Sequence, residues 1–149
     1  MMRMIIGVIL GYVAMAAFVF ITFSVTYMIL ETEGSFQPNS YEVSVSWIFA
    51  SIVLGLAGAI LGGLTSVSIG RSKGAPKILA GLVLVLGIAM AIPTFSTVDR
   101  QPLVRTGEVA LMEAMQSAHQ PSWLVFINPL IGAAGVLVGS RLRKDRTKR

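Results

Sequence analysis

The chain has 149 residues, of which 54% are hydrophobic and 13% are charged, with no cysteine and a formal net charge of +5. Because an ordinary soluble domain carries about 25% charged residues, this composition excludes a soluble enzyme and a disordered chain. The absence of cysteine excludes a disulfide-stapled secreted domain, a thiolate nucleophile and a cysteine-ligated zinc or iron–sulfur site.

Four long segments contain no Asp, Glu, Lys or Arg, and each is close to or above the ~20 residues that span a bilayer. They predict an all-α integral membrane protein, a four-transmembrane-helix bundle in a single domain. Arg3 precedes the first apolar run, which exceeds the roughly 7–15 residues of a signal-peptide core, so we expect it to remain attached as a span. The predicted spans cover residues 4–30, 44–70, 77–98 and 121–140, and a basic tail follows at 141–149.

The basic residues fall on one side of these spans. One precedes span 1, three lie between spans 2 and 3, and six follow span 4, so ten of the twelve Lys and Arg share a side. The positive-inside rule therefore predicts that both termini are cytoplasmic. The outline of the chain resembles that of many small four-span bacterial proteins, so the expected location is the inner (cytoplasmic) membrane of a bacterium. Tyr27, Trp47 and Trp123 fall at the opposite ends of their spans and are predicted to be interfacial anchors.

The juxtamembrane position of the cations indicates anionic lipid headgroups, rather than nucleic acid, as their partner. We therefore expect membrane lipids and other membrane subunits as partners, and no nucleic acid. The candidates for contact with headgroups or with another subunit are Arg141, Arg143, Lys144 and Arg146.

Two connections carry structural signals. Residues 71–77 contain Gly74 and Pro76, which predicts a tight turn and makes spans 2 and 3 antiparallel neighbours. The connection between spans 3 and 4 is longer, and it is predicted to hold an amphipathic helix at 106–119 with Thr106 as its N-cap. We expect this helix to lie on the outer membrane surface or to cap the bundle.

At helical spacing, Met112, Met115 and His119 share one face of this amphipathic helix. Thioether and imidazole groups together suit Cu(I), but the apolar underside of an interfacial helix gives the same pattern. We expect no bound metal and no other cofactor, and copper is kept as the alternative.

Spans 2 and 4 share a pattern of small residues at a constant offset of 77. This repeat predicts a duplicated two-helix hairpin with both copies in the same topology. The alternative is that small residues are simply common in membrane spans. The corresponding residues are Gly55, Ala57, Gly58 and Gly62 in span 2, and Gly132, Ala134, Gly135 and Gly139 in span 4.

Small residues four apart mark two adjacent faces of span 2, one with Gly58 and Gly62 and the other with Gly55 and Gly63. Lipid tails are as apolar as leucine, so spans associate through close backbone approach, which such rows permit. Either both faces are filled within the bundle, or one is left for a partner helix. In span 4 the helix-packing candidates are Gly132, Gly135 and Gly139.

Chemically active groups are sparse in the predicted spans. Most pumps and proton-coupled transporters carry an intramembrane charge, and these spans have none between their ends. The strongest polar feature is Asn128-Pro129, where proline removes a helical hydrogen bond and asparagine can bond a neighbouring helix. Interhelical bonding and a packing kink are expected there, with a ligand or ion site as the alternative. No catalytic constellation is visible, and we do not expect an enzyme.

These observations predict a non-catalytic accessory or structural subunit that packs into and stabilises a larger bacterial membrane assembly. Respiratory and photosynthetic complexes are the hosts considered. The competing hypothesis is a homo-oligomeric transporter of a small molecule or a lipid. No motif ties the chain to a characterised family.

Overall fold

The computed structural model describes residues 1–97, 104 and 107–146, and this part of the chain is helical apart from turns and isolated bridges. All helices except the fourth are long and apolar enough to cross a membrane, which confirms the all-helical class and the four candidate spans. In chain order the helices are α1 (Met2–Ser35), α2 (Val45–Gly70), α3 (Ala75–Thr97), α4 (Leu111–Ser117) and α5 (Ser122–Arg146).

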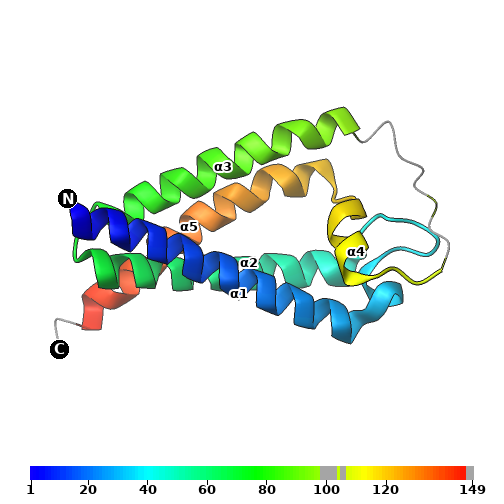
Figure 1. Cartoon of the computed structure of the whole chain (residues 1–149), viewed down its shortest axis with the longest axis horizontal. Helices are drawn as coiled ribbons and strands as arrows, with labels where there is room; N and C mark the ends of the chain where they lie inside the picture. The colour runs from blue at the N-terminus through cyan, green and yellow to red at the C-terminus, as the bar shows by residue number, and fades with distance from the viewer. Residues whose placement is uncertain (98–103, 105–106, 147–149) are drawn as a thin grey trace.

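The long helices run along one another and define two ends of the molecule (Figure 1). The terminal end holds the start of α1, the turn at 71–74 and the end of α5. The α4 end holds α4 and the loop at 36–44. The basic residues with described side chains all lie at the terminal end: Arg3, Arg71, Lys73, Lys77, Arg141 and Arg143. The acidic residues with described side chains all lie at the α4 end: Glu31, Glu33, Glu42, Glu108 and Glu113.

Local signals set the bounds of α2. Its N-cap is Ser44, whose hydroxyl accepts a hydrogen bond from the Trp47 amide at 3.1 Å and so satisfies one free donor of the first turn. The helix ends at Arg71, whose left-handed backbone (φ 44°) lets its amide bond the carbonyl of Val67. The Ser72 hydroxyl then accepts from the Gly74 amide at 3.1 Å, which closes the predicted tight turn into α3.

The two small-residue faces of α2 contact different neighbouring helices. Along one face, Gly58 lies against α1 beside Val19, and Gly62 lies against the backbone of Gly11. Along the other face, Gly63 lies directly against the backbone of Val136 in α5. The row of Gly58 and Gly62 therefore meets α1 along its length, whereas the row of Gly55 and Gly63 meets α5 at Gly63 and has open space beside Gly55.

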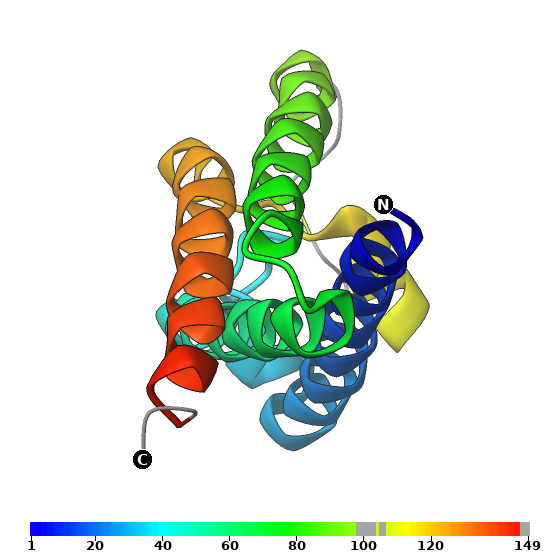
Figure 2. The same cartoon turned by 90° about the vertical axis from the view of Figure 1, so that its left-hand side faces the viewer.

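The interior between these helices is closed at the terminal end. The buried cluster there draws on all four long helices and is built from small and medium side chains, which matches the close helix approach. Figure 2, which looks along the bundle from the terminal end, shows the four long helices surrounding this region. The buried members are Val8, Ala59, Ala75, Leu79, Ala80 and Val136.

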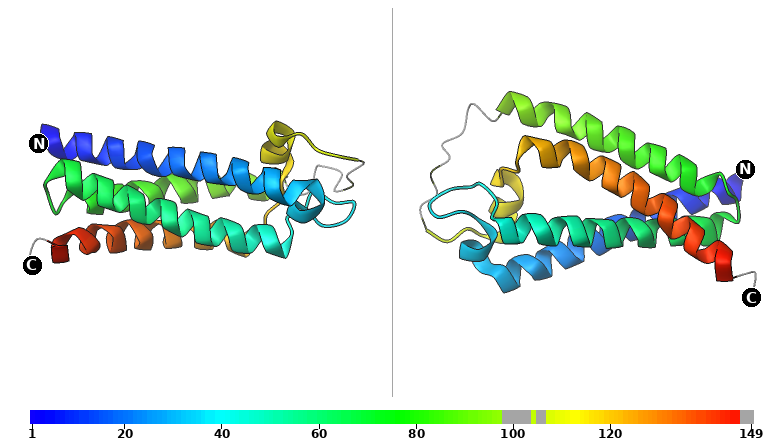
Figure 3. Two further views of the ribbon diagram at one scale, coloured as in Figure 1. Left: turned by 90° about the horizontal axis from the view of Figure 1, so that it is seen from below. Right: turned by 180° about the vertical axis from the view of Figure 1, so that it is seen from behind.

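The helix α3 contacts α2, as predicted from the turn, but its main neighbour is another helix. Although a tight turn joins α2 to α3, α3 packs mainly against α5. The contacts with α5 are more extensive because Gly87 of α3 receives the buried ring of Pro129, and Gly132 of α5 lies beside Val83. These contacts draw α3 onto α5, and α3 and α1 diverge toward the α4 end, where α4 lies between them (Figures 1 and 3).

Other bounds differ in detail. The helix α1 continues to Ser35, but Glu31 breaks its helical backbone (φ 53°, ψ −172°), so the regular part ends where span 1 was predicted to end. The helix α5 runs to Arg146 and incorporates most of the predicted basic tail. The amphipathic helix is shorter than its predicted 106–119 range, because α4 covers only Leu111–Ser117 and its N-cap is Ala110. Thr106 lies outside the described residues.

The residues that suggested a duplication do not have equivalent neighbours. Gly58 and Gly62 face α1, whereas their counterparts Gly135 and Gly139 face α2, next to Ala59 and Ile60. A strict repeat of the hairpin places those counterparts against α3. The duplication stays a prediction from the sequence.

Candidate functional site

A group of three hydrogen bonds around Tyr27 joins the segment before α4 to the end of α1. The buried Tyr27 hydroxyl donates to the Val109 carbonyl at 2.5 Å and lies 3.3 Å from the Thr32 hydroxyl oxygen. The Val109 amide in turn donates to the same Thr32 oxygen at 3.2 Å. The break at Glu31 places Thr32 in this position, because it turns the chain just after the regular part of α1.

The segment after α4 is held by the loop between α1 and α2. The His119 amide donates to the Tyr41 carbonyl at 2.9 Å, and the Val43 amide donates to the His119 carbonyl at 3.1 Å. The Tyr41 hydroxyl donates to the Glu113 carboxylate at 2.9 Å. The helix α4 is therefore anchored on both sides, which explains how a helix of 7 residues keeps one position.

An aromatic cluster lies beneath α4. The rings of Phe23 and Trp47 are 5.7 Å apart, those of Tyr27 and Trp47 are 6.2 Å apart, and those of Tyr27 and Phe36 are 6.4 Å apart. Each pair meets edge to face, the geometry that the ring quadrupoles favour. The buried face of α4 covers this cluster with Leu111, Ala114 and the following Ala118.

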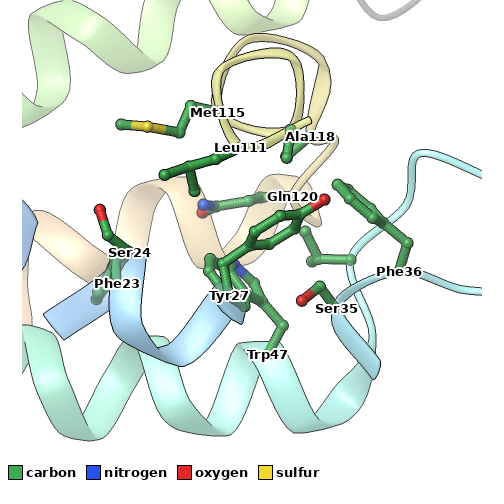
Figure 4. Close-up of a pocket in the computed structure, with 12 residues that line it drawn as sticks. Phe23, Ser24, Tyr27, Ser35, Phe36, Trp47, Leu111, Met115, Ala118 and Gln120 are labelled. Atoms are coloured by element: carbon green, nitrogen blue, oxygen red, sulfur yellow. The ribbon is translucent and has the colours of Figure 1, made fainter. Parts of the chain in front are cut away.

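A cavity of about 160 Å³ lies within this cluster. The hydroxyl oxygen of Ser35, a residue only 2% exposed, lines it and has no hydrogen-bond partner in the described part of the chain. Figure 4 shows the Ser35 hydroxyl directed toward Tyr27 and Trp47, and the Gln120 amide between Leu111 and Tyr27. The lining consists of Phe23, Ser24, Tyr27, Ser35, Phe36, Val43, Trp47, Leu111, Ala114, Met115, Ala118 and Gln120.

A second, open hollow of about 450 Å³ lies on the other side of Tyr27 and Leu111. Glu31, Glu33 and Glu108 line it, and all three are exposed. Among the described residues, no group of three or more His, Asp or Glu side chains is arranged to hold a metal ion.

The three predicted interfacial anchors occupy different environments. Tyr27 is only 7% exposed and bonded to Val109, so its ring packs inside the α4 end of the protein. Trp47 is half-buried between Phe23 and Tyr27. Trp123 is 52% exposed at the start of α5, a position that suits an interfacial ring.

Of the predicted face of Met112, Met115 and His119, only the two methionines lie on the helix. The helix α4 ends at Ser117, so His119 lies in the extended segment after it, with its Nδ1 2.8 Å from the Ser117 carbonyl. Met112 and Met115 are 66% and 54% exposed, and α4 buries the neighbouring face instead. The separation of His119 from the helix leaves the copper alternative without its shared face.

All but one of the predicted helix-packing glycines lie at a contact between two helices. Gly58 and Gly62 meet α1, Gly63, Gly135 and Gly139 join α2 to α5, and Gly132 meets α3; a Cβ added at Gly55 has nothing within 4 Å. Pro129 lies buried against Gly87, and the adjoining Asn128 is half-buried. Arg141 and Arg143 are exposed, whereas the side chains of Lys144 and Arg146 lie outside the described set.

Sequence reasoning missed the cavity and the buried residue Ser35 in its wall. Phe23, Phe36 and Trp47 are separated along the chain, and only the turn from α1 into α2 brings them together. One signal was available, because aromatic residues gather at 18–49 and are scarce in span 3. That gathering indicates an aromatic end of the bundle, although not a hollow one.

Comparisons with known proteins add no likeness to this description: no family model, curated protein or solved structure matches the chain significantly. The class of the protein therefore follows from its own helices. Four helices of sufficient length and apolarity are those of a multi-pass helical membrane protein.

The hydrogen bonds around Tyr27 give a testable prediction. Changing Tyr27→Phe removes the donor to the buried Val109 carbonyl, so we expect a loss of about 1–3 kcal/mol in the stability of the α4 end. Faster hydrogen exchange at the Val109 and Ala114 amides is the measurement. The matched control is Tyr41→Phe, which removes an exposed bond to Glu113 and is expected to cost under about 1 kcal/mol. Equal exchange rates in the two variants would contradict the assignment.

Proposed function

We propose that this protein is a non-catalytic structural or accessory subunit of a larger bacterial membrane assembly. In this proposal it lies in the inner membrane with both termini in the cytoplasm, and the basic residues of the terminal end contact anionic headgroups or a partner. Neighbouring membrane subunits and lipids are its partners, and nucleic acid is not.

The observation that carries the proposal is that the spans contain no ionisable residue between their ends and pack closely against one another. No Asp, Glu, Lys, Arg or His occurs between residues 4 and 30, 44 and 70, 78 and 98, or 121 and 140. Ion and proton translocation normally needs such groups inside the membrane. The half of the bundle near the terminal end is also filled, because Gly11 lies against Gly62 and Leu79, and Gly63 lies against Val136.

The same packing weighs against a transporter that works as a single chain. A solute path through the bundle has to pass the buried cluster around Leu79 and Val136, both of which are 0% exposed. A transporter therefore needs a path between copies of the chain, which is the homo-oligomeric alternative.

Purification from native membrane in a mild detergent tests the proposal. The expected result is co-migration with at least one chain of different sequence in a fixed ratio. A chain that runs alone or only with copies of itself, and that moves a solute across liposomes, would replace the subunit with the transporter.

Two variants control for hydrophobic sticking in detergent. Gly55→Ala adds a methyl group in open space and is expected to keep the partner. Gly63→Ala disturbs the contact of α2 with α5 and is expected to lose it. A partner retained equally by both variants is held by general hydrophobic adhesion, not by the folded bundle.

A further inference from the structure

We propose that the cavity beneath α4 binds one ring-sized, membrane-soluble molecule that carries a hydroxyl or carbonyl oxygen, such as an alkylphenol. This site is separate from the proposed subunit role and does not depend on it.

The size of the cavity fits one six-membered ring. Its volume is about 160 Å³, close to the roughly 150 Å³ of an engineered apolar cavity that stays dry and binds benzene. Its walls contain the rings of Phe23, Tyr27, Phe36 and Trp47, which already meet one another edge to face. An aromatic guest extends this arrangement, because the same edge-to-face geometry is favourable for each added ring.

One polar group in the cavity requires an explanation. The Ser35 hydroxyl has no partner among the described residues, and leaving such a group buried and unbonded is costly. A ligand oxygen at this point satisfies it. The Gln120 amide, which extends into the same space, supplies a second polar contact (Figure 4).

The arrangement also orients the ligand. Ser35 and Phe36 are buried at one side of the cavity, whereas Ser24 and the 54%-exposed Met115 lie at the other (Figure 4). Ser24 belongs to the apolar, membrane-spanning part of α1. The oxygen of the ligand therefore faces Ser35, and an apolar substituent opposite the oxygen points past Met115 toward the hydrocarbon.

Trp47 provides the readout. It lines the cavity, and the chain has only one other tryptophan, the exposed Trp123. The Trp123→Phe variant is reconstituted in lipid nanodiscs, and Trp47 is excited at the red edge of its absorption band. Its emission is measured while para-ethylphenol or ethylbenzene is added, with each concentration expressed as a mole fraction in the membrane. The expected result is a saturable change with both probes and tighter binding of the phenol.

The Ser35→Ala variant separates the hydrogen bond from the hydrophobic contribution. This variant is expected to bind para-ethylphenol about three- to tenfold more weakly, which corresponds to the loss of one hydrogen bond. Its affinity for ethylbenzene is expected to be unchanged or higher. No saturable change with either probe, or equal effects of Ser35→Ala on both probes, would overturn the site. A merely hydrated cavity gives one of these two results.

Two further arms test the cavity and its opening. Ala118→Leu fills the cavity and is expected to lower the binding affinity for both probes more than tenfold. Ala110→Leu changes the exposed residue before α4 and is expected to leave both affinities unchanged. Thermal unfolding of each variant verifies its fold, and the Ser35→Ala comparison does not depend on the filled variant. Para-octylphenol is expected to compete with para-ethylphenol; failure to compete would overturn entry from the membrane.

Discussion

Replacing Gly63 with alanine is expected to destabilise the bundle by about 3 kcal/mol. A Cβ at this position collides with the backbone carbonyl of Val136, and a backbone atom cannot move aside as a flexible side chain can. The contact between α2 and α5 must then widen, which disturbs Ala59 and Val136 in the buried cluster beside it. Thermal or denaturant unfolding in detergent measures the loss.

The matched control is Gly55→Ala in the same helix and the same small-residue row. A Cβ added at Gly55 meets nothing within 4 Å, so the methyl group causes no collision. Alanine favours a helix over glycine by up to about 1 kcal/mol, so this variant is expected to be neutral or slightly stabilised. Equal losses in the two variants would falsify the claim that close approach at Gly63 holds the helices together.

The partner glycine on α5 extends the argument. A Cβ at Gly139 collides with the carbonyl of Ile60, three residues before Gly63 on α2. Both glycines serve one contact, so the two alanine variants are expected to be non-additive, with the double variant losing less than the sum. Strict additivity would indicate that they act at independent sites.

The four spans could be predicted because their physical cause is local. A run of charge-free residues long enough for the bilayer identifies a span without reference to any other part of the chain. The same holds for the turn after α2, which depends on residues close in sequence. Small-residue spacing likewise identified Gly58, Gly62 and Gly63 as packing positions.

The choice of neighbour could not be predicted in the same way. The turn at 71–74 gives α2 and α3 a common end but does not set how far they diverge. The contact of Gly87 with Pro129 and that of Gly63 with Val136 decide that α5 lies between them. Both contacts join residues that are far apart in the sequence, and without a set of related sequences no pattern in one chain reveals them.

The α4 end shows the same limit more strongly. A face of Met112, Met115 and His119 assumes a helix that continues past Ser117, but the bridge of His119 to Tyr41 and Val43 stops it. The cavity depends on that bridge and on the break at Glu31. Neither is a property of local helical periodicity.

The predicted orientation gives a second large, all-or-none result. The chain has no cysteine, so single cysteines can be introduced without a background. Gln37 is exposed at the α4 end, and Lys73 is exposed at the terminal end. In intact cells, Gln37→Cys is expected to react with an impermeant thiol reagent, whereas Lys73→Cys is expected to react only after the membrane is permeabilised.

The physical reason is the charge difference between the two ends. Arg3, Arg71, Lys73, Lys77, Arg141 and Arg143 gather at the terminal end, and retention of Lys and Arg on the cytoplasmic side sets the orientation of short-looped membrane proteins. Val53→Cys, on the lipid-facing side of α2, is the control and is expected to stay unlabelled in both conditions. Labelling of Lys73→Cys in intact cells would reverse the orientation. The same labels also show on which side of the membrane the cavity lies, because Gln37 is two positions from the cavity residue Ser35. A reversed orientation would place the cavity on the cytoplasmic side.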